Sequence, residues 1–245
     1  MNMYAVISDI HANLEALGAV LADADMAGAD RLVCLGDLVG YGPDPNRCVS
    51  LVREAADAVV AGNHDLAAVG RLDISWFNDT ARRAIRWTAA RLEPDISSYI
   101  ASLPLERRIG DTLMVHGSPR NPLEEYLLDG YAARSSFGSD DFHLCLVGHS
   151  HRPLVFMLAA NGEVTMMEPG VDTLLELRDS HRYIVNAGSV GQPRDRNPAA
   201  AYCLYDPEGQ VIAFRRTAYA VERTQEKMRA AGLPRSLIDR LGDGR

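Results

Sequence analysis

Short apolar runs recur along the first part of the chain, and polar side chains follow several of them directly. The runs at 4–7, 31–35, 58–60, 112–115 and 144–147 have the length and composition of buried strands. The residues that follow these runs and could bind a metal ion are Asp9, His11, Asp37, Asn63, His64, His116, His149 and His151. Because ligands bind beyond the strand ends of α/β sheets, we expect these ends to converge on one edge of a sheet.

Helical periodicity separates these runs and predicts an α/β chain. Apolar residues recur at helical spacing over 13–26, 46–55, 78–92, 94–102 and 131–137. Between 105–109 and 112–115, Gly110-Asp111 predicts the turn of a hairpin.

The last third of the chain predicts short strands and one closing helix. The strands are expected at 154–158, 163–167, 173–177, 183–185, 201–205 and 211–216. A helix over 221–231 is expected to stop at Gly232 and Pro234. Because we find no internal repeat, low-complexity tract or linker, we expect a single domain over residues 1–245.

Composition limits the classes of protein that remain. The 245 residues are 47% hydrophobic, which is enough to bury a core, and the net charge is −8. An acidic chain without a basic face does not fit a protein that coats nucleic acid or a membrane surface. The four cysteines form no CxxC pair, and no apolar run approaches the thickness of a bilayer. We therefore expect a cytoplasmic protein.

The polar strand ends predict a metal centre. Residues i and i+2 of an extended segment point the same way, so Asp9 and His11 can bind one cation. One such motif occurs easily by chance, whereas five in order indicate a shared site. Two carboxylates, four imidazoles and one amide, without a thiolate, suit Mn, Fe, Zn, Co or Ni better than Mg or Ca. The glycines that would allow close backbone approach are Gly36, Gly62, Gly117 and Gly148.

The order of these motifs resembles a known superfamily. The segments Asp9-x-His11, Gly36-Asp37-x-x-Gly40, Gly62-Asn63-His64-Asp65, His116-Gly117 and Gly148-His149-x-His151 are similar to the five motifs of the calcineurin-like metallophosphoesterases. The run from Asn186 to Pro193 extends the likeness to the bacterial phosphodiesterase-like branch. The resemblance implies an α/β fold of four layers, a double β-sandwich flanked by helices as in metallo-dependent phosphatases. The motif set is specific to the superfamily, but not to a substrate.

The resemblance also implies the role of each site residue. Two divalent transition-metal ions are expected, with Mn favoured and Fe, Zn, Ni or Co left open. Asp37 would bridge them, and His64 would face the scissile phosphate with Asp65 orienting it. A hydroxide between the metals would attack phosphorus in line. The metal ligands would be Asp9, His11, Asp37 and His151 for the first ion, and Asp37, Asn63, His116 and His149 for the second.

Several further residues have both a functional and a structural interpretation. Tyr41, Arg120 and Arg194 follow site-proximal segments and are candidates for substrate binding, although each could be a packing or surface residue. Asn13 could touch the site, but we favour a helix cap. The loop 121–129 could be a lid. The histidines outside the motifs, which we expect to be structural or exposed, are His143 and His181.

The leading functional hypothesis is a two-metal phosphoesterase that hydrolyses phosphodiesters or phosphomonoesters. A cyclic-nucleotide or general phosphodiesterase, a dinucleoside polyphosphate hydrolase and a protein serine/threonine phosphatase all stay open. A nuclease fits less well, because the chain has no basic stripe. The non-enzyme alternative is a metal-binding scaffold, like the retromer subunit of this superfamily. We place it below the enzyme because every ligand and His64 are present.

The expected partners follow from the same observations. We expect a small phosphorylated substrate, with nucleotides among the candidates, and neither a membrane nor a nucleic acid as partner. A homo-oligomer stays open.

Overall fold

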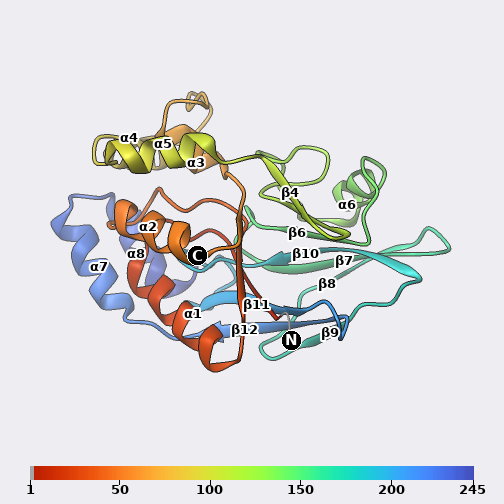
Figure 1. Cartoon of the computed structure of the whole chain (residues 1–245). Helices are drawn as coiled ribbons and strands as arrows, with labels where there is room; N and C mark the ends of the chain where they lie inside the picture. Colours follow the sequence, from red (N-terminus) through yellow and green to blue (C-terminus); the bar gives the residue numbers. More distant parts are fainter. Residues whose placement is uncertain (1–2) are drawn as a thin grey trace.

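Two six-stranded mixed sheets form the centre of the protein (Figure 1). The computed structural model describes residues 3–245. The first sheet has the order β3 (Ala58–Val59), β2 (Arg31–Cys34), β1 (Tyr4–Ile7), β11 (Ala200–Asp206), β12 (Val211–Thr217) and β9 (Leu174–Glu176). The second has the order β4 (Glu106–Ile109), β5 (Thr112–Val115), β6 (Leu144–Val147), β10 (His181–Ala187), β7 (Pro153–Ala159) and β8 (Val164–Met167). The predicted α/β double sandwich flanked by helices is confirmed.

Helices surround the two sheets, and several of them cover an outer sheet face (Figure 1). The helices are α1 (Leu14–Met26), α2 (Pro45–Ala55), α3 (Asn63–Ala68), α4 (Asp79–Ala89), α5 (Pro94–Ser102), α6 (Gly130–Phe137), α7 (Val221–Ala230) and α8 (Arg235–Asp243). Within residues 3–245, none of these helices is long and apolar enough to span a bilayer.

Two of these helices differ from the prediction. Gly232, with φ of 69°, ends α7 as expected, but Pro234 then begins α8. Proline suits a helix start because the first backbone N–H groups of a helix have no partner within it. The segment that begins with Asn63 was expected to extend a strand end, and it instead forms the short helix α3.

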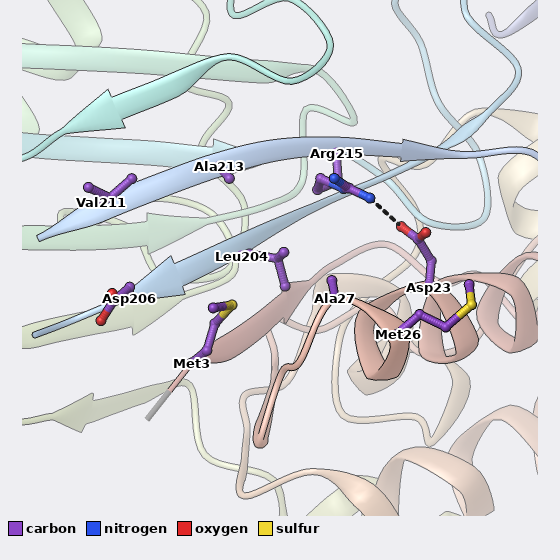
Figure 2. A pocket seen from close by; sticks show the side chains of 9 residues that line it. All are labelled: Met3, Asp23, Met26, Ala27, Leu204, Asp206, Val211, Ala213 and Arg215. Atoms are coloured by element: carbon purple, nitrogen blue, oxygen red, sulfur yellow. Dashed lines mark ion pairs between the residues drawn. The ribbon is translucent and has the colours of Figure 1, made fainter. Parts of the chain in front are cut away.

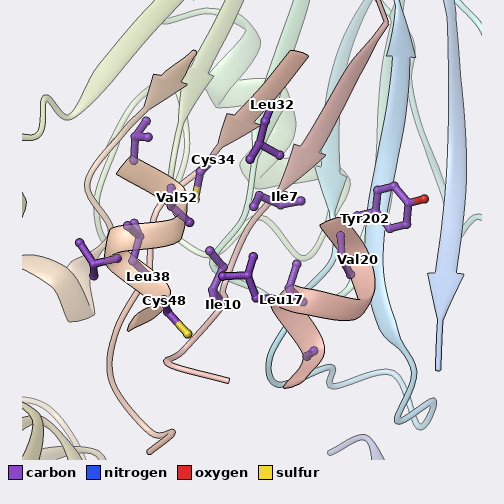
Figure 3. Packing of buried hydrophobic residues seen from close by; sticks show 14 of the residues in the cluster. Ile7, Ile10, Leu17, Val20, Leu32, Cys34, Leu38, Cys48, Val52 and Tyr202 are labelled. Carbon is purple, nitrogen blue, oxygen red and sulfur yellow. The ribbon is translucent and has the colours of Figure 1, made fainter. Parts of the chain in front are cut away.

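The core between the sheets consists of branched and aromatic side chains from both inner faces. Val6 and Val33 come from the first sheet, and Leu144 and Val185 from the second. On the outer face of the first sheet, apolar residues of α1 and α2 pack over β1 and β2 (Figure 3). All four cysteines are buried and free. Burial of these apolar faces on both sides holds the strand ends in a defined place.

The end of β10 links the two sheets. The backbone N–H groups of Val190 and Gly191 donate to the carbonyl groups of Ser8 and Asp9, at 2.9 Å each. The Ser189 hydroxyl donates to the Asp9 carbonyl, also at 2.9 Å. The run that follows a strand of the second sheet thus holds the end of β1 in the first.

The C-terminal helices pack on α4 and on α1. Ile85 of α4 shares a buried cluster with Leu237 and Ile238 of α8. The Trp87 indole N–H donates to the Ala231 carbonyl at 2.9 Å. In this cluster Tyr41, from the loop after β2, brings the C-terminal helices close to the polar strand ends.

The inter-sheet core predicts a stability difference between two leucines. Leu144 is 1% exposed and Leu174 is 68% exposed. We expect Leu144→Ala to lower the free energy of unfolding by about 2–5 kcal/mol, because it leaves a cavity between the sheets. Leu174→Ala is the matched control and should change it little. Urea denaturation followed by circular dichroism measures both, and equal losses would contradict this core assignment.

Candidate metal centre

The polar strand ends meet across both sheets, and not on one sheet edge as predicted. Strands β1, β2 and β3 run parallel in the first sheet, and β5 and β6 run parallel in the second. Parallel strands place their carboxyl ends on the same side. The correction has a simple reason: sequence periodicity identifies strands, but it does not show which sheet each strand joins.

One group of buried side chains contains Asp9, His11, Asp37 and His151, each at most 2% exposed. The Nε2 atoms of His11 and His151 lie 3.1 Å apart. His151 Nε2 lies 3.2 Å from Asp9 Oδ1, and His11 Nε2 lies 3.5 Å from Asp37 Oδ2. All four residues therefore direct a ligand atom at one point.

A second group shares Asp37 with the first. His116 Nε2 lies 3.4 Å from Asp37 Oδ2 and 3.2 Å from His149 Nδ1. The Asn63 side-chain oxygen lies 3.2 Å from the same His116 nitrogen. The structure thus brings together the seven side chains that the sequence predicted as ligands, with Asp37 common to both groups.

A backbone carbonyl orients each of the four imidazoles. The Nδ1 atoms of His11, His116 and His151 face carbonyl oxygens at 3.1, 2.8 and 2.6 Å. His149 uses the other ring nitrogen, with Nε2 3.2 Å from the Glu124 carbonyl. A ring N–H that donates to a carbonyl leaves the opposite nitrogen with a lone pair for a metal. This arrangement is typical of metal-bound histidines.

The local electrostatics favour a bound cation. Burial lowers the pKa values of His11 and His151, so both rings are neutral. Their Nδ1 atoms face carbonyls, so two lone pairs oppose each other across 3.1 Å. Asp9 Oδ1 and Asp37 Oδ2 are buried without a hydrogen-bond donor. A divalent cation would satisfy all four atoms, so the donor set fits a metal.

The pKa values of Asp9, Asp37 and His116 follow from their burial close to one another. Burial raises the pKa of Asp9 to about 7, and the Asp37 charge adds to it. Burial would also raise the pKa of Asp37, but His116 and His64 hold it well below its usual range. Burial opposes a charge on His116, yet Asp37 raises the pKa of His116 to about 9. A bound cation competes with these protons, so metal affinity should fall as the pH falls.

Left-handed backbone directs many of these side chains. The φ angles of Asp9, His11, Asp37, His149 and His151 all lie between 49° and 66°. This region is costly for residues other than glycine, and such strain concentrates at functional sites. Asp9 and His11 therefore do not converge as alternate residues of an extended strand, as we had predicted. They follow β1 in tight turns, which periodicity cannot reveal.

None of the four glycines predicted to allow close approach has room for a Cβ: at Gly36 it would lie 2.5 Å from the Gly62 nitrogen, and at Gly117 2.7 Å from the Asn121 carbonyl oxygen. A Cβ on Gly62 would overlap the Asp37 carboxylate, and a Cβ on Gly148 would overlap the Ser8 hydroxyl. The Gly148 Cβ would also lie 2.9 Å from Asp9 Oδ2. The predicted close approach at these positions is therefore present.

His64 lies beside the metal groups in the first turn of α3. Its ring centroid is 4.9 Å from His11, 4.4 Å from Tyr41 and 5.2 Å from Phe77. Its Nδ1 is buried without a hydrogen-bond partner. The His64 backbone N–H donates to Asp37 Oδ1 at 2.9 Å, which ties the helix to the carboxylate that both groups share.

Asp65 differs from its predicted contact with the His64 ring. Its two carboxylate oxygens accept hydrogen bonds from the backbone N–H groups of Gly62, at 3.0 Å, and Val39, at 3.1 Å. Burial raises the pKa of Asp65 to about 7. Asp65 therefore holds the loops on either side of Asp37 together, because the helical turn directs its carboxylate at the backbone.

The candidate substrate residues occupy different environments. Tyr41 packs on His11 with 4.6 Å between ring centroids, so it lies at the site. The Arg194 guanidinium lies 6.0 Å from the Tyr41 ring and donates to the Gln192 side-chain oxygen at 2.9 Å. Arg120 is half exposed and forms an ion pair with Glu125, so its charge is already neutralised within the loop.

The remaining predictions concern structural residues. Asn13 caps α1 by accepting the Ala16 N–H at 3.2 Å, as we favoured. His143 lies 3.2 Å from the Arg178 carbonyl, and His181 lies 2.9 Å from the Ser180 hydroxyl. Neither histidine belongs to a metal group.

Tyr126 and Gln192 lie in segments that the sequence analysis singled out, but neither residue was selected individually. Tyr126, in the loop 121–129, stacks on His149 with 3.8 Å between centroids and is 45% exposed. Gln192 is 1% exposed, and its backbone carbonyl faces His151. The loop thus contacts the site, and its sequence position between a hairpin and a helix was the only indication.

A separate hollow of about 570 Å³ lies between α1 and β12 on the outer face of the first sheet (Figure 2). Its lining includes Met3, Met26 and an ion pair of 3.5 Å between Arg215 and Asp23. The lining contains no histidine or cysteine. The third charged residue of the lining, Asp206, accepts hydrogen bonds from the backbone N–H groups of Glu208 and Gly209 at 3.0 Å each.

Comparison with known proteins agrees with this site. The family model of the calcineurin-like phosphoesterase superfamily domain matches residues 1–210. The uncharacterized protein MJ0912 of Methanocaldococcus jannaschii is 39% identical, covering 100% of this chain and 99% of its own length. The chain therefore belongs to the calcineurin-like phosphoesterase superfamily.

Solved structures show the same fold. A metallophosphoesterase from Sphaerobacter thermophilus is 45% identical, with a TM-score of 0.90 and 99% of both chains covered. The hypothetical protein PH1004 from Pyrococcus horikoshii OT3 is 20% identical, with a TM-score of 0.78, covering 100% of this chain and 99% of its own. The protein is a member of a metallophosphoesterase family with a buried Asp/His cluster suited to metal.

The shared position of Asp37 predicts the effect of removing its charge. Asp37→Asn can keep the oxygen that accepts the His64 N–H, but it loses the charge that both groups share. We expect loss of metal from at least one group and loss of activity, measured by elemental analysis and hydrolysis. Asp25→Asn, at an exposed carboxylate on α1, is the control. Unchanged metal content in Asp37→Asn would contradict the shared role.

Proposed function

We propose that this protein hydrolyses phosphate esters of small substrates with two divalent transition-metal ions, of which Mn is favoured. The observation that carries the proposal is the set of four buried imidazoles, each oriented by a backbone carbonyl toward two buried carboxylates. Family membership supports a phosphoester as the substrate class. The buried free cysteines are compatible with a cytoplasmic location.

The metals, when bound, would supply positive charge for the phosphoryl group and lower the pKa of a water nucleophile. Asp9, His11, Asp37 and His151 would hold one ion, and Asp37, Asn63, His116 and His149 the other. The chain itself keeps these groups rigid through buried turns. Rigid donors need no reorganisation during the reaction, which is where an enzyme gains most of its electrostatic stabilisation.

His64 is the group that we assign to the leaving side of the phosphate. Its ring packs between Tyr41 and Phe77, and His64 is not among the residues whose ligand atoms converge in either metal group. An imidazole in this place can donate a hydrogen bond to a phosphate oxygen or protonate the leaving oxygen. The Tyr41 and Phe77 rings restrict the orientation of the His64 ring. The same orientation is compatible with either role.

A metal-dependence assay tests the proposed function. Chelated protein, checked by circular dichroism to be folded, should not hydrolyse bis(p-nitrophenyl) phosphate or p-nitrophenyl phosphate. Adding Mn²⁺ should restore hydrolysis, and the ratio of the two rates distinguishes a diesterase from a monoesterase. Two bound metals without hydrolysis of either compound would favour a metal-binding scaffold instead.

Removal of His64 separates chemistry from metal binding. We expect His64→Ala to keep its metal and to lower kcat about 10²–10⁴-fold, the range of a positioned acid. The loss should be smaller for p-nitrophenolate esters than for alkyl esters, because a good leaving group needs no proton. The control is His143→Ala, which lies outside both metal groups. Equal losses for both esters would leave His64 as a hydrogen-bond donor, and loss of metal would make it a ligand.

A further inference from the structure

Two arginines from distant parts of the chain converge on one side-chain oxygen. Arg194 follows the end of β10, and Arg240 lies in the last turn of α8. Arg194 Nη2 donates to Gln192 Oε1 at 2.9 Å, and Arg240 Nη1 donates to the same oxygen at 3.3 Å. Two positive charges are therefore held close together by a single neutral acceptor.

Neither charge is neutralised within residues 3–245. The other arginines near the site have acidic partners, as Arg120 has Glu125 and Arg216 has Asp195. No carboxylate lies within 4.0 Å of the Arg194 or Arg240 guanidinium in the part of the chain described. Both side chains are only partly exposed, so water compensates them incompletely. Burial, and then the Arg194 charge, lowers the pKa of Arg240. Such a pair favours an anion between its members.

Gln192 connects this arginine pair to the metal centre. Its backbone carbonyl faces His151 Nδ1 at 2.6 Å, and the Arg194 backbone N–H donates to the His151 carbonyl at 3.2 Å. The Gln192 side-chain nitrogen is buried without a partner. The Gln192 side-chain oxygen accepts hydrogen bonds from two guanidinium groups, while the side-chain nitrogen has no acceptor. This arrangement indicates that Gln192 positions the two arginines.

There is space for a ligand beside Arg240. A cavity of about 360 Å³ lies between the start of α4 and α8, and Tyr41 forms one of its walls. The same Tyr41 ring contacts His11 and His64. The cavity therefore adjoins the metal centre. Its lining residues are Tyr41, Asn78, Thr80, Ser236, Leu237, Arg240 and Arg245.

We propose that Arg194 and Arg240 form a binding site for a second phosphate group of the substrate. The proposal rests on the proposed function, since the first phosphate would lie at the metals. The substrate class is then a compound with two phosphate groups, of which one is hydrolysed and the other is held by the arginines. Guanidinium groups suit this role because their planar N–H pairs match phosphate oxygens.

The position of Arg240 makes it a determinant of specificity. It belongs to α8, beyond residues 1–210 that the family model matches. The superfamily motifs supply the metal ligands, whereas this C-terminal helix supplies a charge that only a larger anion can reach. The helix is fixed by its apolar contacts with α4, so the charge is held in place before substrate binds.

Calorimetry with inorganic pyrophosphate tests this site without relying on turnover. The probes are pyrophosphate and orthophosphate, titrated into chelated, folded protein. We expect Arg240→Gln and Arg194→Gln each to weaken pyrophosphate binding about tenfold or more, as expected for a charged hydrogen bond. Orthophosphate binding should weaken less. Arg235→Gln is the control, because this α8 arginine is 92% exposed and pairs with Asp239.

A second measurement separates binding from a merely structural role. Pyrophosphate should also inhibit hydrolysis of p-nitrophenyl phosphate by the Mn-loaded protein, and Arg240→Gln should raise its inhibition constant more than that of orthophosphate. Arg240→Lys should recover part of the affinity. A lowered Tm in Arg240→Gln with unchanged pyrophosphate affinity would show a structural contact and overturn the proposal.

The two proposals can fail separately. Arginine-dependent pyrophosphate binding without any metal-dependent hydrolysis would support the second phosphate site and reject the proposed function. Metal-dependent hydrolysis with equal pyrophosphate affinity in the wild type, Arg240→Gln and Arg194→Gln would support the proposed function and reject the second phosphate site. Metal-dependent hydrolysis by a wild type that binds no pyrophosphate would have the same meaning.

Discussion

Two carboxylates and four imidazoles are buried together at the strand ends, and the rest of the structure has to make that burial tolerable. Water cannot reach these groups, so their charge must be balanced locally. The protein provides backbone N–H groups for one oxygen of Asp9 and one of Asp37, and carbonyls for each ring. Within the part of the chain described, it does not provide a hydrogen-bond donor for the remaining oxygens, Asp9 Oδ1 and Asp37 Oδ2. A metal ion bound between the two groups would satisfy both oxygens.

The double sandwich positions these groups by joining two independent sheets at their carboxyl ends. The linkage through Ser189, Val190 and Gly191 fixes the end of β1 against the end of β10. Left-handed turns at Asp9 and His11 then bring these side chains into one group with Asp37 and His151. The large apolar clusters on the outer face of the first sheet and between the sheets offset the free-energy cost of this backbone strain. The site can therefore be rigid although its backbone is strained.

The C-terminal helices also hold a candidate functional side chain in place by packing, outside the two metal groups. They form no part of either sheet, yet they bring Arg240 to Gln192, whose backbone already orients His151. Under the proposed function, the strand ends would perform the chemistry and the C-terminal helices would contribute to substrate recognition.

The sequence by itself determined the strands, most helices and which seven side chains are candidates for binding metal, because hydrophobic periodicity and residue chemistry are local properties. It also determined that Asn13 caps a helix, since a cap depends on its neighbours in the chain. Tertiary structure decided which sheet each strand joins and that Asp65 binds backbone rather than His64. It also decided that Arg240 meets Arg194, because contacts between distant residues depend on packing that no local pattern encodes.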